Sequence, residues 1–295
     1  MIYLTEYFAK FILDKACDGL SENTLTDYYI KIDRFVKFVG EELPLSSLDV
    51  DLCKSYYFNL RCGLGNTVSI QSYIRPLRAF LNWLFVNEYI SVDICSKFRL
   101  PKAYKPVIDV LTDAEIIRLY DSIPNDANVL HLRNKVILSL MLDCGLRLNE
   151  VVSARRVDLH LRERYLIVTG KGNKQRIVAF GSYTASILGG YLRSIPPNEA
   201  LLLTSEEVPI TRDTVKNMFR RLRVSSGISR LYPHLLRHTF ATRYLENGGN
   251  IYALQQLLGH SSLDMVKKYL HLSQGRLVSD FGRFSPIDCL ANKKT

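Results

Sequence analysis

The sequence predicts a mainly α-helical protein of class α+β with two domains, the second of which contains a small antiparallel sheet. Three observations lead to this prediction. The chain of 295 residues is long enough to bury two hydrophobic cores. Apolar residues recur at helical spacing through residues 1–100, and a proline-bearing stretch, 101–110, then interrupts them. After Arg164 the spacing changes from the helical period to that of two short strands.

Residues 1–100 are expected to form a bundle of four or so helices. Capping residues and glycine stops place these helices at about 4–19, 21–40, 49–60 and 67–84. Pro76 falls inside the last range and should kink or split that helix, because proline lacks the backbone N–H. No cluster of catalytic residue types is visible in this domain.

The composition argues against several classes of protein. No run of about 18 apolar residues is present, so we expect no membrane span. The first residues lack the basic and apolar regions of a signal peptide. The six cysteines contain no CxxC pair and resemble neither a disulfide framework nor a zinc site. We therefore expect reduced thiols, no bound metal and a cytoplasmic location.

The positive charge is concentrated in the second domain. Residues 1–100 contain 11 basic and 12 acidic side chains, although the whole chain has a formal net charge of +10. The remaining two-thirds is therefore strongly basic. This distribution favours a polyanion as partner, most simply a nucleic acid, although basic composition alone does not prove it.

The second domain should follow an extended linker at 101–110, where two prolines disfavour the helical conformation. Thr112 and Glu115 predict a capping box at its first helix. A buried helix is expected to run from about Leu132 to Gly145. The next turn should present Arg147 and start another helix.

Two strands, 165–169 and 175–180, are expected to pair around a glycine-bearing hairpin. Lys171, Lys174 and Arg176 lie close together at this hairpin. They fit either a solvated edge guarded by basic side chains or a surface that contacts DNA.

A helix from Thr211 to about Val224 should carry a basic stripe opposite its apolar face. The stripe consists of Arg212, Lys216, Arg220 and Arg223. A solvated amphipathic face would explain it equally well in general, but residues 214–244 contain no acidic side chain. This absence of mixed charge favours a helix that lies along DNA.

Four potentially catalytic side chains occur within a short stretch near the C-terminus. His234 and Arg237 should share one helix face, because residues three apart are neighbours. After a stop at 248–249, Asn250 should cap a second helix that Gly259 ends. His260 follows directly, and Tyr269 should lie on a third helix. Each residue alone is more often structural, so the prediction depends on their joint spacing.

With these motifs in order, residues 111–275 resemble the tyrosine recombinase family, with a layout similar to Xer-type recombinases and the integrases of small mobile elements. The matching segments are 145–150, 170–176, 234–242, 258–262 and Tyr269. Residues 1–100 resemble the family's SAM-like core-binding domain in length and topology. Cys144 departs from the threonine common at that position. The tail, 276–295, is expected to contact a neighbouring subunit, as tails of the family often do.

The resemblance implies a site-specific recombinase that needs neither metal nor nucleotide cofactor. Tyr269 would attack the DNA phosphodiester and form a 3′-phosphotyrosine, which conserves the energy of the broken bond. Two guanidiniums can hold the phosphate oxygens, as developing negative charge requires. The six expected catalytic residues are Arg147, Lys171 (proton donor to the leaving oxygen), His234, Arg237, His260 and Tyr269, whereas Glu150 is expected to orient rather than react.

The resemblance also implies partners. Four protomers would assemble on two double-stranded DNA sites built from inverted repeats and exchange strands through a Holliday junction. A second recombinase or an accessory protein is a further candidate partner. Two alternatives remain open from the residues: a type IB topoisomerase-like nicking and closing enzyme, and a catalytically idle, site-specific DNA-binding protein.

Overall fold

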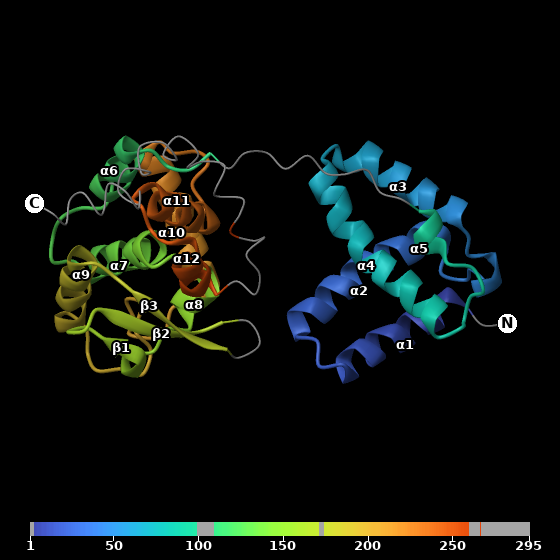
Figure 1. Cartoon of the computed structure of the whole chain (residues 1–295), viewed down its shortest axis with the longest axis horizontal. Helices are drawn as coiled ribbons and strands as arrows, with labels where there is room; N and C mark the ends of the chain where they lie inside the picture. The colour runs from blue at the N-terminus through green and yellow to red at the C-terminus, as the bar shows by residue number, and fades with distance from the viewer. Residues whose placement is uncertain (1–2, 99–108, 171–173, 260–265, 267–295) are drawn as a thin grey trace, which may run out of the picture. The chain divides into compact units, whose positions relative to one another are not determined.

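The computed structural model describes residues 3–98, 109–170, 174–259 and residue 266. The chain divides into two compact units, Met1–Val107 and Ile108–Thr295 (Figure 1), which are described separately below. The predicted linker lies almost wholly outside the described residues, and the predicted tail lies entirely outside them, so both remain predictions. The mainly helical class with one small antiparallel sheet is confirmed.

The N-terminal unit is a helical bundle. Its helices are α1 (Leu4–Cys17), α2 (Glu22–Val39), α3 (Val50–Leu64), α4 (Thr67–Val86) and the short α5 (Ile94–Lys97). Of the two outcomes predicted at Pro76, a kink or a split, the split is wrong, because α4 continues through this residue, and the kink stays a prediction. Apolar residues are buried on both sides of the proline, including Ile74 and Leu77, and this packing outweighs one missing backbone hydrogen bond.

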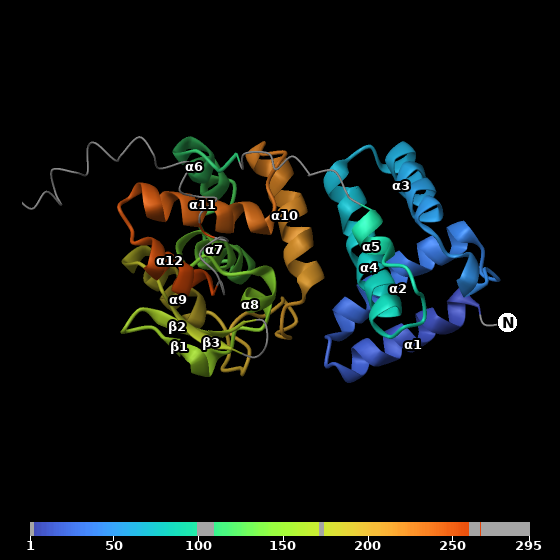
Figure 2. The same cartoon turned by 45° about the vertical axis from the view of Figure 1, so that its right-hand side comes forward.

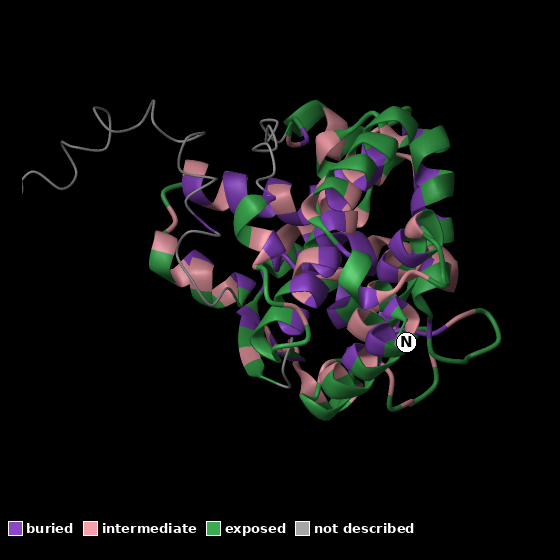
Figure 3. Ribbon diagram, turned by 90° about the vertical axis from the view of Figure 1, so that its right-hand side faces the viewer, coloured by how far each residue is buried: buried purple, intermediate pink, exposed green. Residues whose placement is uncertain are grey.

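The core of the N-terminal unit is rich in aromatic side chains. The rings of Phe11 and Phe80 lie 5.3 Å apart, and Trp83 packs edge-on against Phe11. The Trp83 indole N–H donates to Asp14 at 2.8 Å, so its polar atom is satisfied at the edge of the core. Figure 3 shows buried and exposed residues recurring along the helices, as expected for amphipathic helices around one core.

The second unit contains seven described α-helices and one short 3-10 helix, Arg156–Asp158. The α-helices are α6 (Asp113–Asp121), α7 (Val129–Asp143), α8 (Leu148–Val152), α9 (Ser182–Arg193), α10 (Arg212–Ser226), α11 (Pro233–Glu246) and α12 (Ile251–Leu258). The capping box is confirmed: the backbone N–H of Glu115 donates to Thr112 Oγ1, and that of Thr112 donates to the Glu115 carboxylate. The sequence analysis did not predict α9.

The predicted hairpin is confirmed as part of a three-stranded antiparallel sheet. Strand β2 (Tyr165–Thr169) pairs with β3 (Gln175–Ala179), and β2 also pairs with the two-residue β1 (Leu159–His160), which the sequence analysis missed. The backbone N–H of Gly170 donates to the Lys174 carbonyl at 2.8 Å and closes the described part of the hairpin. Figures 1 and 2 show α7 between this sheet and α11.

The ends of the last two described helices also agree with their sequence signals. Helix α11 is followed by Gly248 at a φ of 85°. Asn250 then caps α12 by accepting from the backbone N–H of Tyr252 at 2.8 Å, and Gly259 ends α12 in the left-handed conformation. Of the third helix, predicted to carry Tyr269, only residue 266 is described, and it is helical.

Candidate active site

The candidate site is centred on one buried carboxylate, that of Glu150 in α8, whose residue is only 3% exposed. The turn between α7 and α8 brings Glu150 close to Arg147, which precedes α8. The backbone N–H of Arg147 donates to Glu150 Oε2 at 2.8 Å, and its guanidinium Nη1 donates to Oε1 at 2.9 Å. Glu150 therefore fixes both the main chain and the side chain of a predicted catalytic arginine, while the Arg147 side chain remains 32% exposed.

Arg176 on β3 binds the same carboxylate. Its Nη1 and Nη2 donate to the two oxygens of Glu150, each at 2.8 Å, and its Nε donates to the Leu257 carbonyl at 2.7 Å. The Arg176 side chain is only 12% exposed. Arg176 was predicted from the sequence to be one of several residues that contact DNA, but the structure places its guanidinium in a network of contacts within the protein.

Arg237 on α11 lies on the third side of this cluster and is 3% exposed. Its Nη1 donates to the Gly145 carbonyl at 2.5 Å and its Nη2 to the Leu258 carbonyl at 2.7 Å. Its Nη1 also lies 4.0 Å from Glu150 Oε2. The structure thus brings together the two arginines that the sequence predicted as a phosphate clamp, with Arg176 as a third cation.

Glu150 keeps its negative charge although it is buried. Burial raises the pKa of its carboxyl, but the hydrogen bonds from Arg176 and Arg147 and the charges of both arginines more than offset this effect. The net result is a pKa below the ordinary value, so Glu150 is ionised near neutral pH. A buried carboxylate surrounded by arginines satisfies the requirement that buried charges be paired.

Backbone carbonyls at the end of α12 complete this network, and the sequence analysis missed them. The last carbonyls of a helix have no partner within the helix, and they carry the negative end of its dipole. Arg176 and Arg237 each donate to one of them, those of Leu257 and Leu258. The Leu258-Gly259 pair in the sequence could have predicted these acceptors, because it marks the end of a helix, where backbone carbonyls lack a partner within the helix.

The remaining predicted catalytic residues are placed only in part. His234 is exposed in the first turn of α11, three residues before Arg237. Its ring centroid lies 6.5 Å from that of His238. Lys171, His260 and Tyr269 lie outside the described residues, although Gly170 and Gly259 immediately precede Lys171 and His260 in the chain.

The predicted basic stripe occupies the exposed side of α10. Arg212, Lys216, Arg220 and Arg223 are all exposed, opposite a buried face that includes Val215 and Phe219. Two of them also have partners within the protein, since Lys216 pairs with Asp213 at 3.0 Å and Arg223 Nε donates to the Leu231 carbonyl at 2.6 Å. Lys174 is exposed at the hairpin. These residues remain candidates for DNA contact.

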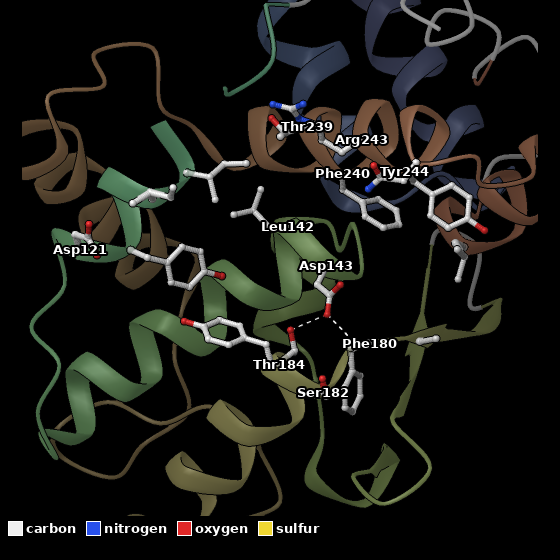
Figure 4. Close-up of a pocket in the computed structure, with 18 residues that line it drawn as sticks. Asp121, Leu142, Asp143, Phe180, Ser182, Thr184, Thr239, Phe240, Arg243 and Tyr244 are labelled. Atoms are coloured by element: carbon white, nitrogen blue, oxygen red, sulfur yellow. Dashed lines mark hydrogen bonds between the residues drawn. The ribbon is translucent and has the colours of Figure 1, made fainter. Parts of the chain in front are cut away.

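A groove of about 840 Å³ lies elsewhere in the second unit, between α6, α7, α9 and α11. Figure 4 shows Phe180, Phe240 and Tyr244 around it. At one side Asp143 accepts hydrogen bonds from the Gly181 N–H and the Thr184 hydroxyl, both at 2.7 Å. None of the described residues predicted to be catalytic lines this groove, but Leu257, whose carbonyl accepts from Arg176, does line it, so the groove borders the candidate active site.

No helix in the described ranges is both long and apolar enough to span a bilayer.

Comparison with family models gives matches along nearly the whole chain. Residues 109–276 match the phage integrase family, and residues 3–100 match the phage integrase SAM-like domain. Among curated relatives, tyrosine recombinase XerD of Staphylococcus saprophyticus is 29% identical, over 96% of this chain and 98% of the relative. Tyrosine recombinase XerC of the same organism is also 29% identical, over 87% of this chain and 89% of the relative.

Solved structures show the same fold. The crystal structure of XerA recombinase is 26% identical with a TM-score of 0.52, and the match covers 95% of this chain and 99% of that one. The Tn1549 transposon integrase bound to transposon right end DNA has a TM-score of 0.77 at 19% identity, over 94% of this chain and 100% of that one. Together with the family match over more than half of the sequence, these similarities show that the chain belongs to the phage integrase family and is an Xer-like tyrosine recombinase.

Proposed function

We propose that this chain cleaves and rejoins DNA at specific sites through a 3′-phosphotyrosine at Tyr269, with neither metal nor ATP. The observation that carries the proposal is the cluster of Arg147 and Arg237 around Glu150. Two permanently charged guanidiniums, held by a carboxylate and by backbone carbonyls, form a preorganised site for a phosphate whose negative charge grows in the transition state.

In the proposed step, the Tyr269 oxygen attacks phosphorus and the bond from phosphorus to the 5′-oxygen breaks. The leaving 5′-oxygen takes a proton from Lys171, and His234 helps to accept the phenol proton. His260 donates a further hydrogen bond to the phosphate. Attack of a 5′-hydroxyl on the phosphotyrosine reverses the step, so rejoining conserves the bond energy.

The proposed substrate is double-stranded DNA with an inverted-repeat core, bound by four protomers that exchange strands through a Holliday junction. XerD and XerC relatives support this proposal, as does the fold shared with a lambda integrase tetramer bound to a Holliday junction, which has a TM-score of 0.74 at 20% identity. Lys174 and the stripe Arg212, Lys216, Arg220 and Arg223 would contact DNA phosphates or base edges. A cytoplasmic location fits this substrate.

The tail at 276–295 is proposed to pack on a neighbouring subunit. Its apolar residues include Leu277, Phe281 and Phe284. The groove beside Phe240 and Tyr244 offers apolar surface, and none of the described residues predicted to be catalytic lines it. Deletion of the tail should therefore weaken assembly on paired sites more than it weakens binding of one protomer to one site.

The test begins by selecting a binding site from a random-sequence duplex library with the wild-type chain. A nicked duplex built on the selected site loses a short fragment on cleavage and so traps the covalent intermediate. We expect a protein–DNA band on a denaturing gel with the wild type and none with Tyr269→Phe. A band that persists in Tyr269→Phe would refute the assignment of the nucleophile.

The same reagents separate the alternatives. Recombination between two selected sites, without relaxation of a plasmid that lacks them, is expected for a recombinase. Relaxation of any supercoiled plasmid would indicate a topoisomerase-like enzyme. Binding of the selected site with no covalent band at all would indicate an idle DNA-binding protein.

A further inference from the structure

The geometry points to Arg176 as a positioning residue of the recombinase site. It connects strand β3 with the end of α12 and with the Glu150 carboxylate, which in turn holds the predicted catalytic residue Arg147. This inference rests on the proposed function, because it concerns the cleavage step. It differs from the sequence-based expectation, in which Arg176 is one of several cations that contact DNA phosphates.

The number and direction of its hydrogen bonds argue against a primary contact with DNA. Three of the five N–H groups of this guanidinium already donate to protein, two to Glu150 and one to the Leu257 carbonyl. The side chain is 12% exposed. By contrast, the neighbouring Lys174 and the α10 residue Arg220 are exposed.

Arg176 links segments that carry the rest of the site. Glu150 holds the backbone and side chain of Arg147. The end of α12 holds Arg237 through the Leu258 carbonyl, next to the Leu257 carbonyl that accepts from Arg176. One guanidinium thus fixes the distance between the carboxylate that aligns Arg147 and the helix end that aligns Arg237.

The space around Arg176 is fitted to a planar side chain. A Cβ added to Gly259 would lie 3.1 Å from Arg176 Cδ and 3.2 Å from its Nε, and one added to Gly170 would lie 3.4 Å from its Nη1. Gly170, at the β2–β3 hairpin, and Gly259, at the end of α12, thus lie close to this side chain. A lysine has no fork that could bind both oxygens of Glu150 and a carbonyl together.

The test is Arg176→Lys, measured by single-turnover cleavage of the nicked duplex that carries the selected site. We expect the maximal rate at saturating protein to fall by about 10²-fold, because small misplacements of catalytic groups have effects of that size. The apparent Kd and its salt dependence should change little. If instead the rate at saturation is unchanged while DNA affinity and the salt slope fall, Arg176 binds phosphate and the inference is wrong.

Arg230→Lys is the matched control. Arg230 also binds a carboxylate through both terminal nitrogens, that of Glu115 at 2.5 and 2.9 Å, and donates to the Val110 carbonyl at 3.2 Å. It lies outside the cluster of Arg147, Glu150 and Arg237, so its change should leave the maximal cleavage rate near that of the wild type. An equal loss in both variants would show a general effect of disturbing such pairs and would overturn the inference.

A double-mutant cycle keeps the test valid if Arg176→Lys does not fold. The variant Glu150→Gln/Arg176→Gln removes both members of this ion pair together, so neither Glu150 nor Arg176 is left charged without the other. If Arg176 acts through Glu150, the double variant should cleave about as slowly as the worse single variant, with affinity retained. If the double variant lost the product of the two single variants' fold-losses in cleavage rate, or if it cleaved at the wild-type rate, the inference that Arg176 acts through Glu150 would be wrong. If the wild-type chain itself formed no covalent band, the proposed function would be wrong. This outcome differs from any result that contradicts only the inference about Arg176.

Discussion

The two units of this protein bury different kinds of side chain. Every buried residue in the described part of the N-terminal unit is apolar, aromatic or cysteine, whereas the second unit also buries Arg133, Glu150 and Arg237. Burial of charge is costly unless the charge is paired, and a helical bundle does not need it. Glu150 and Arg237 belong to the candidate site, whereas Arg133 donates to the Leu203 carbonyl and to Asn134 outside it.

The comparison also separates two ways of holding a fold together. The N-terminal unit depends on interlocked aromatic rings around Phe80, while the candidate site depends on hydrogen bonds that converge on Glu150. Apolar packing tolerates small changes of direction, but a bidentate arginine–carboxylate pair requires a fixed geometry. Substitutions in the first unit should therefore act through stability, and those around Glu150 through rate.

The largest expected effect on stability is that of Phe80→Ala. Phe80 is fully buried, and its loss should destabilise the N-terminal unit by about 3–5 kcal/mol. Trp83 is the only tryptophan of the chain and lies in the same core, so its fluorescence in a denaturant titration reports on this unit. Phe219→Ala, in the core of the second unit, is the control and should not shift the Trp83 transition. Equal shifts from both changes would refute separate cores.

The largest expected effect on rate is that of Arg237→Ala. Loss of one preorganised donor to a developing oxyanion costs roughly 10²–10³ in rate, and the Gly145 and Leu258 carbonyls would also lose their partner. Arg133→Ala is the control, since Arg133 is also buried but donates to the Leu203 carbonyl and to Asn134. It should lower the melting temperature with a much smaller loss of cleavage by the folded fraction. A similar loss of rate in both would show that burial, and not position, decides the effect.

Gly145→Ala compared with Gly65→Ala tests packing beside the site. Both glycines have positive φ, 65° and 61°, so each alanine should cost about 1–2 kcal/mol in backbone strain. A Cβ at Gly145 would lie 2.4 Å from Phe240 Cδ1, whereas a Cβ at Gly65 meets no atom of the described chain within 4 Å. Overpacking should add about 1–3 kcal/mol at Gly145 alone. Urea midpoints measure both, and equal shifts would contradict the close approach of Phe240.

The smallest expected effect is a pH dependence of the second unit from Glu115. The hydrogen bonds from Arg230 lower the pKa of Glu115 from its ordinary value to about 2. A lowered carboxyl pKa stabilises the fold above the unfolded pKa, and this stabilisation is lost as pH falls from about 4.5 toward 2. In Glu115→Gln the fall in urea midpoint between neutral and acidic pH, followed by circular dichroism, should be shallower than in the wild type. An unchanged slope would show that this pair is not responsible.

Much of the local structure followed from short-range signals. The capping box of Thr112 and Glu115, the Asn250 cap and the Gly259 stop were predicted, because each depends on residues that contact their own helix end. The β2–β3 hairpin was predicted from alternation and glycine. Helix α4 continues through Pro76, because burial of its apolar face, a tertiary effect, outweighs the tendency of proline to interrupt a helix.

The sequence by itself determined the helical class and the hairpin, since the spacing of residues along the chain carries that information. Its resemblance to the tyrosine recombinases predicted the catalytic residues. Only the tertiary structure showed which groups Arg176 and Glu150 contact, although an orienting role for Glu150 was already expected from the sequence. Their partners lie far apart in the chain, on α8, β3 and the end of α12, and one of them is a backbone carbonyl that no residue type reveals. The same arginine can bind phosphate or hold a carboxylate, and the fold brings the carboxylate within reach.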